Sequence, residues 1–299
     1  MATFQSPPPI VQLDLFEHSR DIMLRNDVVK ALLRREPVAA EKALAVLSGA
    51  FSDDNSLMSL TELLAVLNSR PAPFTTHDQA LKAVEHMETV VLPAAKRVFG
   101  EAEMSKWLVP EWRSLASSAE HLAFDPDHRR AHTAFMLLEA GDWAAAETSI
   151  KRIPSWRRIP ATLAWMAEAR FGGAGLEAAW PFLVELAWSN SELFSELARR
   201  LPDTRLRALL QRFSADLEGS GDQADFAWFP AWLLIEEPSF LPVFREAMQH
   251  DNTTPERCAR TVMELLISER RGGQSTNLEH RRRLQALHPG LFARYKSTR

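Results

Sequence analysis

A helical hairpin over residues 131–153 is the feature that most narrows the folds open to this chain. Two segments of helical periodicity flank Gly141, and Trp143, Ala146 and Ile150 recur along one face of the second segment. A Gly-Asp pair between such segments is typical of a tight turn. The same period recurs along the rest of the sequence, and alternation of period two is absent. The sequence therefore predicts an all-α fold without a sheet.

Composition places the chain among ordinary globular proteins. Of its 299 residues, 46% are hydrophobic and 25% are charged, and the length suits one large domain or two smaller ones. No apolar run approaches the roughly 20 residues that a membrane-spanning helix needs. The net charge of −4 gives no strong attraction to nucleic acid. We therefore expect neither a membrane protein nor one held on nucleic acid by its overall charge.

The single cysteine, Cys258, limits both redox and metal chemistry. One cysteine cannot form an internal disulfide or a cysteine-based zinc cluster. It lies in a helical pattern at 255–269, which favours a buried structural thiol. A nucleophilic thiol would need a histidine partner, and none is close in sequence.

Residue composition also divides the chain. Residues 1–9 end in three prolines and are predicted to form a flexible leader. They carry neither the basic nor the apolar stretch of a secretory signal, so we expect a cytoplasmic protein. Helical patterns fill residues 10–218, and a loop rich in glycine and aspartate at 219–225 separates them from a further helical segment at 226–299. We expect that last segment to pack on the preceding helices.

Small residues recur at a regular interval. Gly141 and Gly173 are 32 residues apart, and each is followed five residues later by an alanine, Ala146 or Ala178. Ala208 follows after another 30 residues. Small side chains at such positions let two helices approach closely. A period in the low thirties with two helices per unit predicts a helical solenoid.

The segment at 137–154, LLEAGDWAAAETSIKRIP, resembles the second half of a tetratricopeptide repeat (TPR). The family's turn and packing positions correspond to Gly141, Asp142, Trp143 and Ala146. A partial match follows at 173–182, and we describe a degenerate TPR-like array over 27–215. The resemblance implies a right-handed α-α superhelix whose concave groove binds a protein or peptide. The alternative is an all-α bundle whose small residues are regularly spaced by chance.

A short motif near the start of the chain resembles the bacterial sliding-clamp-binding pentapeptide at all five positions. The matching residues are Gln12, Leu13, Asp14, Leu15 and Phe16. In that role Leu15 and Phe16 would enter an apolar pocket, Leu13 would add contact, and Gln12 would hydrogen-bond at the rim. The position near a terminus suits an accessible linear segment.

The same residues fit a structural interpretation. Leu13 and Phe16 can form the buried face of the first helix and pack on Met23 and Val28. Burial of Phe16 would make the motif unavailable to a clamp.

Histidine and aspartate residues gather near residues 125–132. His128 and His132 are four residues apart, which would place them on one face of a helix, and Asp125 and Asp127 are close by. There is no HExxH pattern and no evident further ligand, so we expect a helix-start turn and no bound metal.

Two further parts of the sequence concentrate charged residues. Glu236 and Glu237 are adjacent in an aromatic setting, and we interpret them as solvated charges at a helix end. The segment from Thr254 onward holds ten basic and four acidic residues, a net charge of +6. Its triplet Arg281, Arg282 and Arg283 could contact phosphates, although such a run is usually a solvated helix face.

These patterns predict a non-enzymatic, cytoplasmic scaffold that binds a protein or peptide partner in a helical groove. We expect no cofactor, because no nucleophile, base and metal ligand converge in the sequence. The second hypothesis is an accessory protein of bacterial DNA replication or repair, tethered to the sliding clamp through Gln12–Phe16 with its basic C-terminal segment near DNA.

Overall fold

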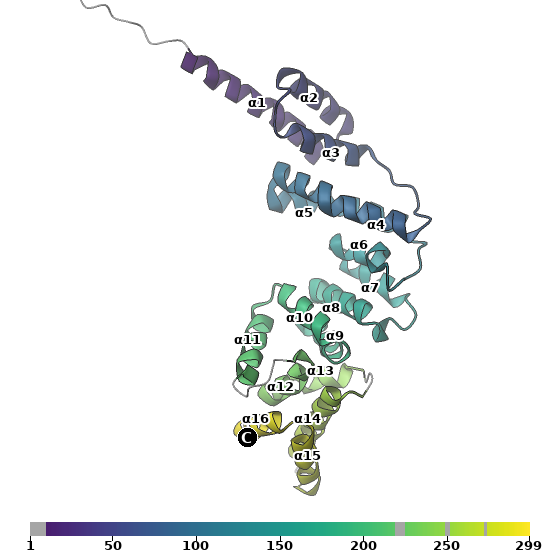
Figure 1. Ribbon diagram of the computed structural model, residues 1–299, viewed down its shortest axis with the longest axis vertical. Helices are drawn as coiled ribbons and strands as arrows, with labels where there is room; N and C mark the ends of the chain where they lie inside the picture. Colours follow the sequence, from purple (N-terminus) through teal and green to yellow (C-terminus); the bar gives the residue numbers. More distant parts are fainter. Residues whose placement is uncertain (1–9, 219–224, 249–251, 272–273) are drawn as a thin grey trace, which may run out of the picture. The chain divides into compact units, whose positions relative to one another are not determined.

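The computed structural model describes the backbone of residues 10–218, 225–248, 252–271 and 274–299. Throughout these ranges the regular elements are helices and no strand occurs, so the predicted all-α class is confirmed (Figure 1). None of the described helices combines the length and apolarity that a membrane span requires. The chain divides into two compact units, Met1–Ala140 and Gly141–Arg299.

The predicted segments do not coincide with this division. The helical array predicted over 10–218 extends across both units. The segment at 226–299 lies within the second unit, where one apolar core extends from residue 163 to residue 295. The predicted leader at 1–9 lies outside the described residues.

The first unit is built around a long helical segment that is kinked at Gly100 and packs against the third and sixth helices. Its core consists of aliphatic and alanine side chains together with two buried tryptophans, Trp107 and Trp112. The elements of this unit are α1 (Ile10–Leu33), α2 (Pro37–Ala50), α3 (Leu57–Asn68), α4 (His77–His86), the π-helical turn η1 (Met87–Val91), α5 (Leu92–Ser118), η2 (Arg129–Ala131) and α6 (Thr133–Glu139).

Arg35 fixes the turn between α1 and α2 onto α5. Its backbone is left-handed, with φ of 57°, a conformation that non-glycine residues adopt at a cost. Its side chain pairs with Glu111, donates from Nη1 to the Trp107 carbonyl oxygen at 3.2 Å and stacks over the Trp107 ring. Trp107 Nε1 in turn donates to the Leu32 carbonyl oxygen at 2.9 Å. Four contacts therefore hold the hairpin against the central helix of the unit.

The second unit contains more and shorter helices than the first. They are α7 (Trp143–Lys151), η3 (Trp156–Arg158), α8 (Pro160–Ala174), α9 (Leu176–Ser189), α10 (Ser191–Arg200), α11 (Thr204–Glu218), η4 (Phe226–Trp228), α12 (Phe229–Glu236), η5 (Pro238–Phe240), α13 (Leu241–Glu246), α14 (Thr254–Arg271), α15 (Gln274–Leu287) and α16 (Pro289–Ser297).

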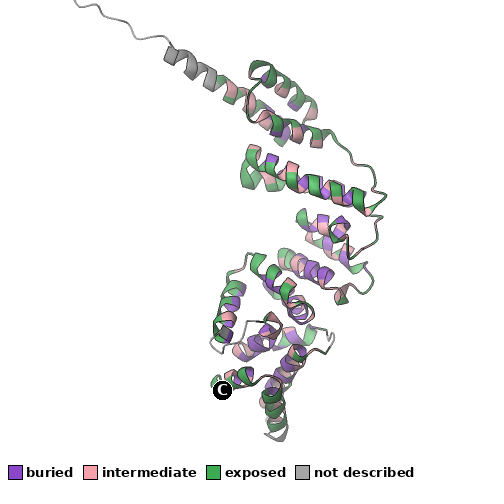
Figure 2. Cartoon of the chain, viewed as in Figure 1, coloured by how far each residue is buried: buried purple, intermediate pink, exposed green. Residues whose placement is uncertain are grey.

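Aromatic rings form the centre of the second unit. Residues 229–235 of α12 are all buried (Figure 2). The Phe213 ring lies edge-on to Phe229 with centroids 5.4 Å apart, and Trp232 lies 5.6 Å from Phe213. Such edge-to-face pairs add to the stabilisation that burial alone provides. The chain has nine tryptophans, and Trp180, Trp188 and Trp232 are buried in this core.

A buried ion pair also crosses the second unit. The Glu185 side chain on α9 is 0% exposed, and Arg157 of η3 donates from Nε to its Oε2 at 2.8 Å. Glu185 Oε1 also accepts from the Met248 backbone N–H at 2.9 Å. A carboxylate removed from water needs such partners, so these contacts tie η3 and the end of α13 to α9.

The hairpin turns differ in register from the predicted repeat. Gly141 has the positive φ, 66°, of the predicted turn, and Ala146 is buried. Gly173 lies inside α8, and the glycine that ends this helix with a positive φ of 81° is Gly175. Ala208 is exposed, so its predicted equivalence with Ala146 is wrong. The predicted turn position is therefore two residues too early, at Gly173 and not at Gly175.

Helices α7 and α8 approach closely at a glycine. A Cβ atom on Gly172 would lie within 2.8 Å of Trp143 Cζ2 and closer still to two other indole atoms. A Cβ atom on Gly173 would make an acceptable contact of 3.4 Å with Trp143 Cβ. Position 172 therefore needs glycine because the indole occupies the space of a side chain.

Gly172→Ala is expected to destabilise the second unit by roughly 1–3 kcal/mol, because overpacking outweighs the gain in helix propensity of about 1 kcal/mol. Gly173→Ala is the matched control and is expected to be neutral or stabilising. Urea unfolding of both variants measures the difference. In a Trp143→Ala background the Gly172→Ala change should become stabilising. Equal stability of the two glycine variants would contradict the proposed close contact.

Candidate functional site

The clamp-type motif falls in the first half of α1. The backbone of Gln12–Phe16 is helical, while the side chains of residues 10–19 lie outside the described part of the structure. Two of their predicted packing partners are described: Val28 is buried, and Met23 is 65% exposed. Packing of the motif on Met23 in a closed core is therefore not supported.

The basic triplet lies on α15 beside acidic residues. Arg281 pairs with Glu269 at 3.3 Å, and Arg283 lies 4.0 Å from Glu264. Arg282 is exposed. Two of the three predicted phosphate contacts thus face carboxylates, which reduces the positive charge that this surface offers to an anion.

Cys258 is fully buried in α14, as predicted for a structural thiol. Burial raises the pKa of this thiol to about 12. The thiolate is the nucleophilic form of cysteine, so Cys258 is protonated and unreactive at neutral pH.

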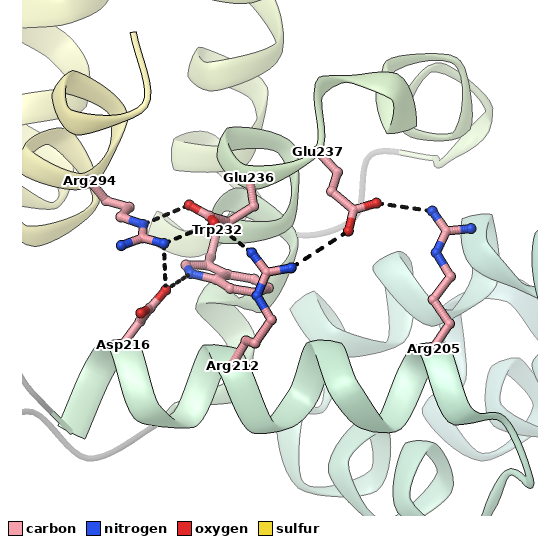
Figure 3. Close-up of polar contacts among 7 residues, drawn as sticks. All are labelled: Arg205, Arg212, Asp216, Trp232, Glu236, Glu237 and Arg294. Carbon is pink, nitrogen blue, oxygen red and sulfur yellow. Dashed lines mark hydrogen bonds and ion pairs between the residues drawn. The ribbon is translucent and has the colours of Figure 1, made fainter.

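Glu236 is the centre of an ion-pair network in the second unit. Its side chain is 6% exposed. The expectation of a solvated charge at this position is therefore wrong. Arg294 of α16 donates to both carboxylate oxygens, from Nε at 2.6 Å and from Nη2 at 2.9 Å, and Arg212 of α11 donates from Nη2 at 2.9 Å (Figure 3). The hydrogen bond from Arg294 is the main cause that lowers the pKa of Glu236, so the carboxylate stays ionised.

Asp216 and Trp232 extend this network. Asp216 Oδ2 lies 3.2 Å from Arg294 Nη2 and accepts from Trp232 Nε1 at 2.9 Å (Figure 3). The Arg212 guanidinium stacks over the Trp232 ring with 5.6 Å between its Cζ and the ring centroid. Helices α11, α12 and α16 are therefore joined by charge-assisted bonds around one indole.

Glu237 forms a second branch on the opposite side of the Arg212 side chain. Its Oε2 accepts from Arg205 Nη2 at 3.0 Å, and its Oε1 lies 3.9 Å from Arg212 Nη1 (Figure 3). Arg205 also donates to Glu177 at 2.8 Å. Adjacent carboxylates in the sequence thus reach different arginines.

The charged groups of the network are paired with one another, which limits its chemistry. Every carboxylate in it has an arginine partner, and every arginine has a carboxylate. An ionised, arginine-paired glutamate with a lowered pKa is a poor general acid or base. We interpret the network as a structural clamp. Sequence reasoning missed it because Arg294 and Glu236 are 58 residues apart and no local pattern relates them.

A depression of about 310 Å³ lies beside this clamp. Leu217, Trp232 and Leu291 give it apolar walls, and Asp216 and Arg294 contribute polar groups. Its size is at the lower end of small-molecule sites. The polar groups at its wall already bond to each other, so they favour no particular ligand.

The predicted metal candidates are separated by the structure. His128 lies in a turn that precedes η2 and bonds through Nδ1 to Asp125 Oδ2 at 2.8 Å, a contact that raises the pKa of His128. His132 caps α6 by accepting from the Ala134 N–H at 3.1 Å. They do not share a helix face, because the predicted helix begins only at residue 133. Among the described residues, no group of three or more possible ligands is placed to hold a metal.

No protein-family model, curated protein or solved structure matches this chain. The function is therefore argued from the residues and geometry described above.

The buried His132 makes the stability of the folded chain depend on pH. Burial lowers its pKa from 6.5 to about 4, so the unfolded chain binds a proton between these values that the folded chain does not. Stability is therefore expected to fall as pH drops from about 6.5 to 4, by about 3 kcal/mol in total, and the contribution of His132 then levels off. Hydrogen exchange of the α6 amides against pH measures this change. His132→Asn keeps a capping acceptor and should lose the dependence; an unchanged pH slope in that variant would contradict the assignment.

Proposed function

We propose that this chain is a non-enzymatic, cytoplasmic scaffold that binds a protein partner through α1–α3. The observation that carries the proposal is the distribution of exposed large hydrophobic side chains. Of eight such residues in the described part of the chain, six belong to or flank these three helices, and Met248 and Leu278 lie elsewhere. The six are Ile22, Met23, Leu33, Val38, Val46 and Met58. Exposed apolar side chains concentrated on a few packed helices favour a protein-binding role for these helices.

A TPR-like organisation is part of this proposal. The positive-φ glycines Gly141 and Gly175 are 34 residues apart, the period of a tetratricopeptide repeat. Each stands between two consecutive helices, and the close approach of Trp143 to α8 is the kind of packing that small residues allow. These features support repeated helical hairpins and favour a groove-binding scaffold over a chance arrangement.

The proposal predicts that charge in the apolar surface abolishes partner binding. A Val38→Glu, Val46→Glu, Met58→Glu variant is expected to lose captured partners at least about tenfold, because each glutamate must be desolvated at the interface. Quantitative affinity capture compares it with wild type. The matched control is Met248→Glu with Leu278→Glu, which adds charge at exposed apolar sites of the second unit and should retain the partners. Identical captured sets for all three proteins would contradict the proposal.

A second candidate is a tether to the bacterial sliding clamp through Gln12–Phe16. Besides the match at five positions, the helix lengths favour it. Helix α1 has 24 residues and its hairpin partner α2 has 14, so α1 is longer by about 15 Å. The motif precedes Val28, the first buried residue described in α1, by about 18 Å along the helix. A segment that extends past its neighbour is available to another protein.

Calorimetry with a sliding clamp tests the tether. The full chain is expected to bind with a dissociation constant in the micromolar range, about −8 kcal/mol, and a Gln12→Ala, Leu15→Ala, Phe16→Ala variant is expected not to bind. Glu17→Ala, His18→Ala, Ser19→Ala is the control on the same helix and should bind normally. A peptide of residues 5–22 that binds when the full chain does not would mean that the fold hides the motif. Absence of binding by both would exclude the tether.

A further inference from the structure

A depression of about 320 Å³ lies in the first unit, apart from the surfaces considered so far. It is formed by the second half of α3, the junction of α4 with η1, and the second half of α5. Its walls are mostly apolar, through Ala65, Val66, Ala83, Met87 and Leu115. All of these elements belong to one compact unit with a common core. A preformed apolar hollow of this size is typical of a site for a small molecule.

The polar groups of this depression are Ser69, His86, Glu111 and Ser114, and Glu111 is the carboxylate among them. Glu111 lines it, and the Glu111 side chain is 11% exposed. Its Oε1 is bonded to Arg35, which does not line the depression. A carboxylate accepts at two oxygens, so Oε2 keeps the capacity to accept a hydrogen bond from a ligand. A largely buried carboxylate that lines the depression favours a ligand that brings a hydrogen-bond donor.

The ion pair between Arg35 and Glu111 decides which ligand charge the depression accepts. The guanidinium already balances the Glu111 charge. A cation brought to the same carboxylate would be repelled by Arg35, and an anion would be repelled by Glu111. An uncharged N–H or O–H donor on an apolar body meets neither penalty.

The backbone beside the depression supports a functional role. Met87, in its wall, begins the π-helical turn η1 between α4 and α5. Single π turns inside helices are rare, and they occur frequently at functional sites. Methionine is a flexible and polarizable side chain that adapts to the shape of an aromatic ligand.

We propose that this depression binds a small, uncharged aromatic molecule whose single N–H or O–H group donates to Glu111. Indole and phenol derivatives have this chemistry. The site uses neither the six exposed apolar residues of α1–α3 nor Gln12–Phe16, so its test can succeed or fail separately from theirs.

The test uses the full chain labelled with ¹³C at its methionine methyl groups, with indole as the probe. The Met87 resonance, assigned by Met87→Leu, is expected to shift with a dissociation constant on the order of 0.1–1 mM. The other methionines are internal references. Indene replaces the N–H group by CH₂ at nearly the same shape, and it should bind at least about tenfold more weakly because it cannot donate.

A pair of variants on α3 locates the site. Ala65→Phe fills the depression and should abolish the indole-induced shift, whereas Thr61→Phe adds the same side chain at an exposed position that does not line it. Circular dichroism confirms that both fold. Three results would overturn the proposal: no Met87 shift with indole, equal affinity for indene, or undiminished binding by Ala65→Phe.

Discussion

The packing of this helical protein depends on glutamates that are buried only in partnership with arginines. Glu111, Glu185 and Glu236 are each largely withdrawn from water, and each meets an arginine 28 to 76 residues away in the sequence. Hydrophobic burial drives helices together without defining their register, whereas an unpaired buried carboxylate is costly enough to exclude alternative packings. Replacing one partner alone would be more damaging than replacing both, because the remaining charge would stay buried.

The helical class and several buried positions were predictable because they depend on local periodicity. The positive-φ turn at Gly141, the burial of Ala146 and Ile150, and the buried thiol of Cys258 follow from apolar spacing and residue size. The repeat register did not follow, because three glycines lie within four residues, at 172, 173 and 175, and the sequence does not show which of them ends the helix. The choice of Gly175 as the left-handed residue is made by where the α8 hydrogen bonds end.

The candidate sites were harder to predict, since they depend on contacts between distant segments. The four-residue spacing of His128 and His132 predicts a shared helix face only if a helix spans both, and the helix begins after them. Glu236 has the local sequence of an exposed helix end, and α16 covers it from a position no motif indicates. The depression at Glu111 likewise combines α3 with α4, η1 and α5, which follow α3 after a loop. Sequence patterns describe which residues could act, and the tertiary fold decides which of them meet.

The left-handed backbone of Arg35 links two parts of the first unit energetically. Adopting this conformation costs about 1 kcal/mol, and the contact with Glu111 compensates for it. Glu111 is shared between the α1–α2 turn and the depression on the other side of its carboxylate. A change in the strength of the Glu111–Arg35 ion pair changes the free energy of the α1–α2 turn by the same amount. A change in the conformation of the turn likewise changes the strength of the ion pair. A ligand that bonds to Glu111 in the depression would therefore change the stability of the α1–α2 turn, and a change in the turn would alter the affinity for that ligand by the same free energy.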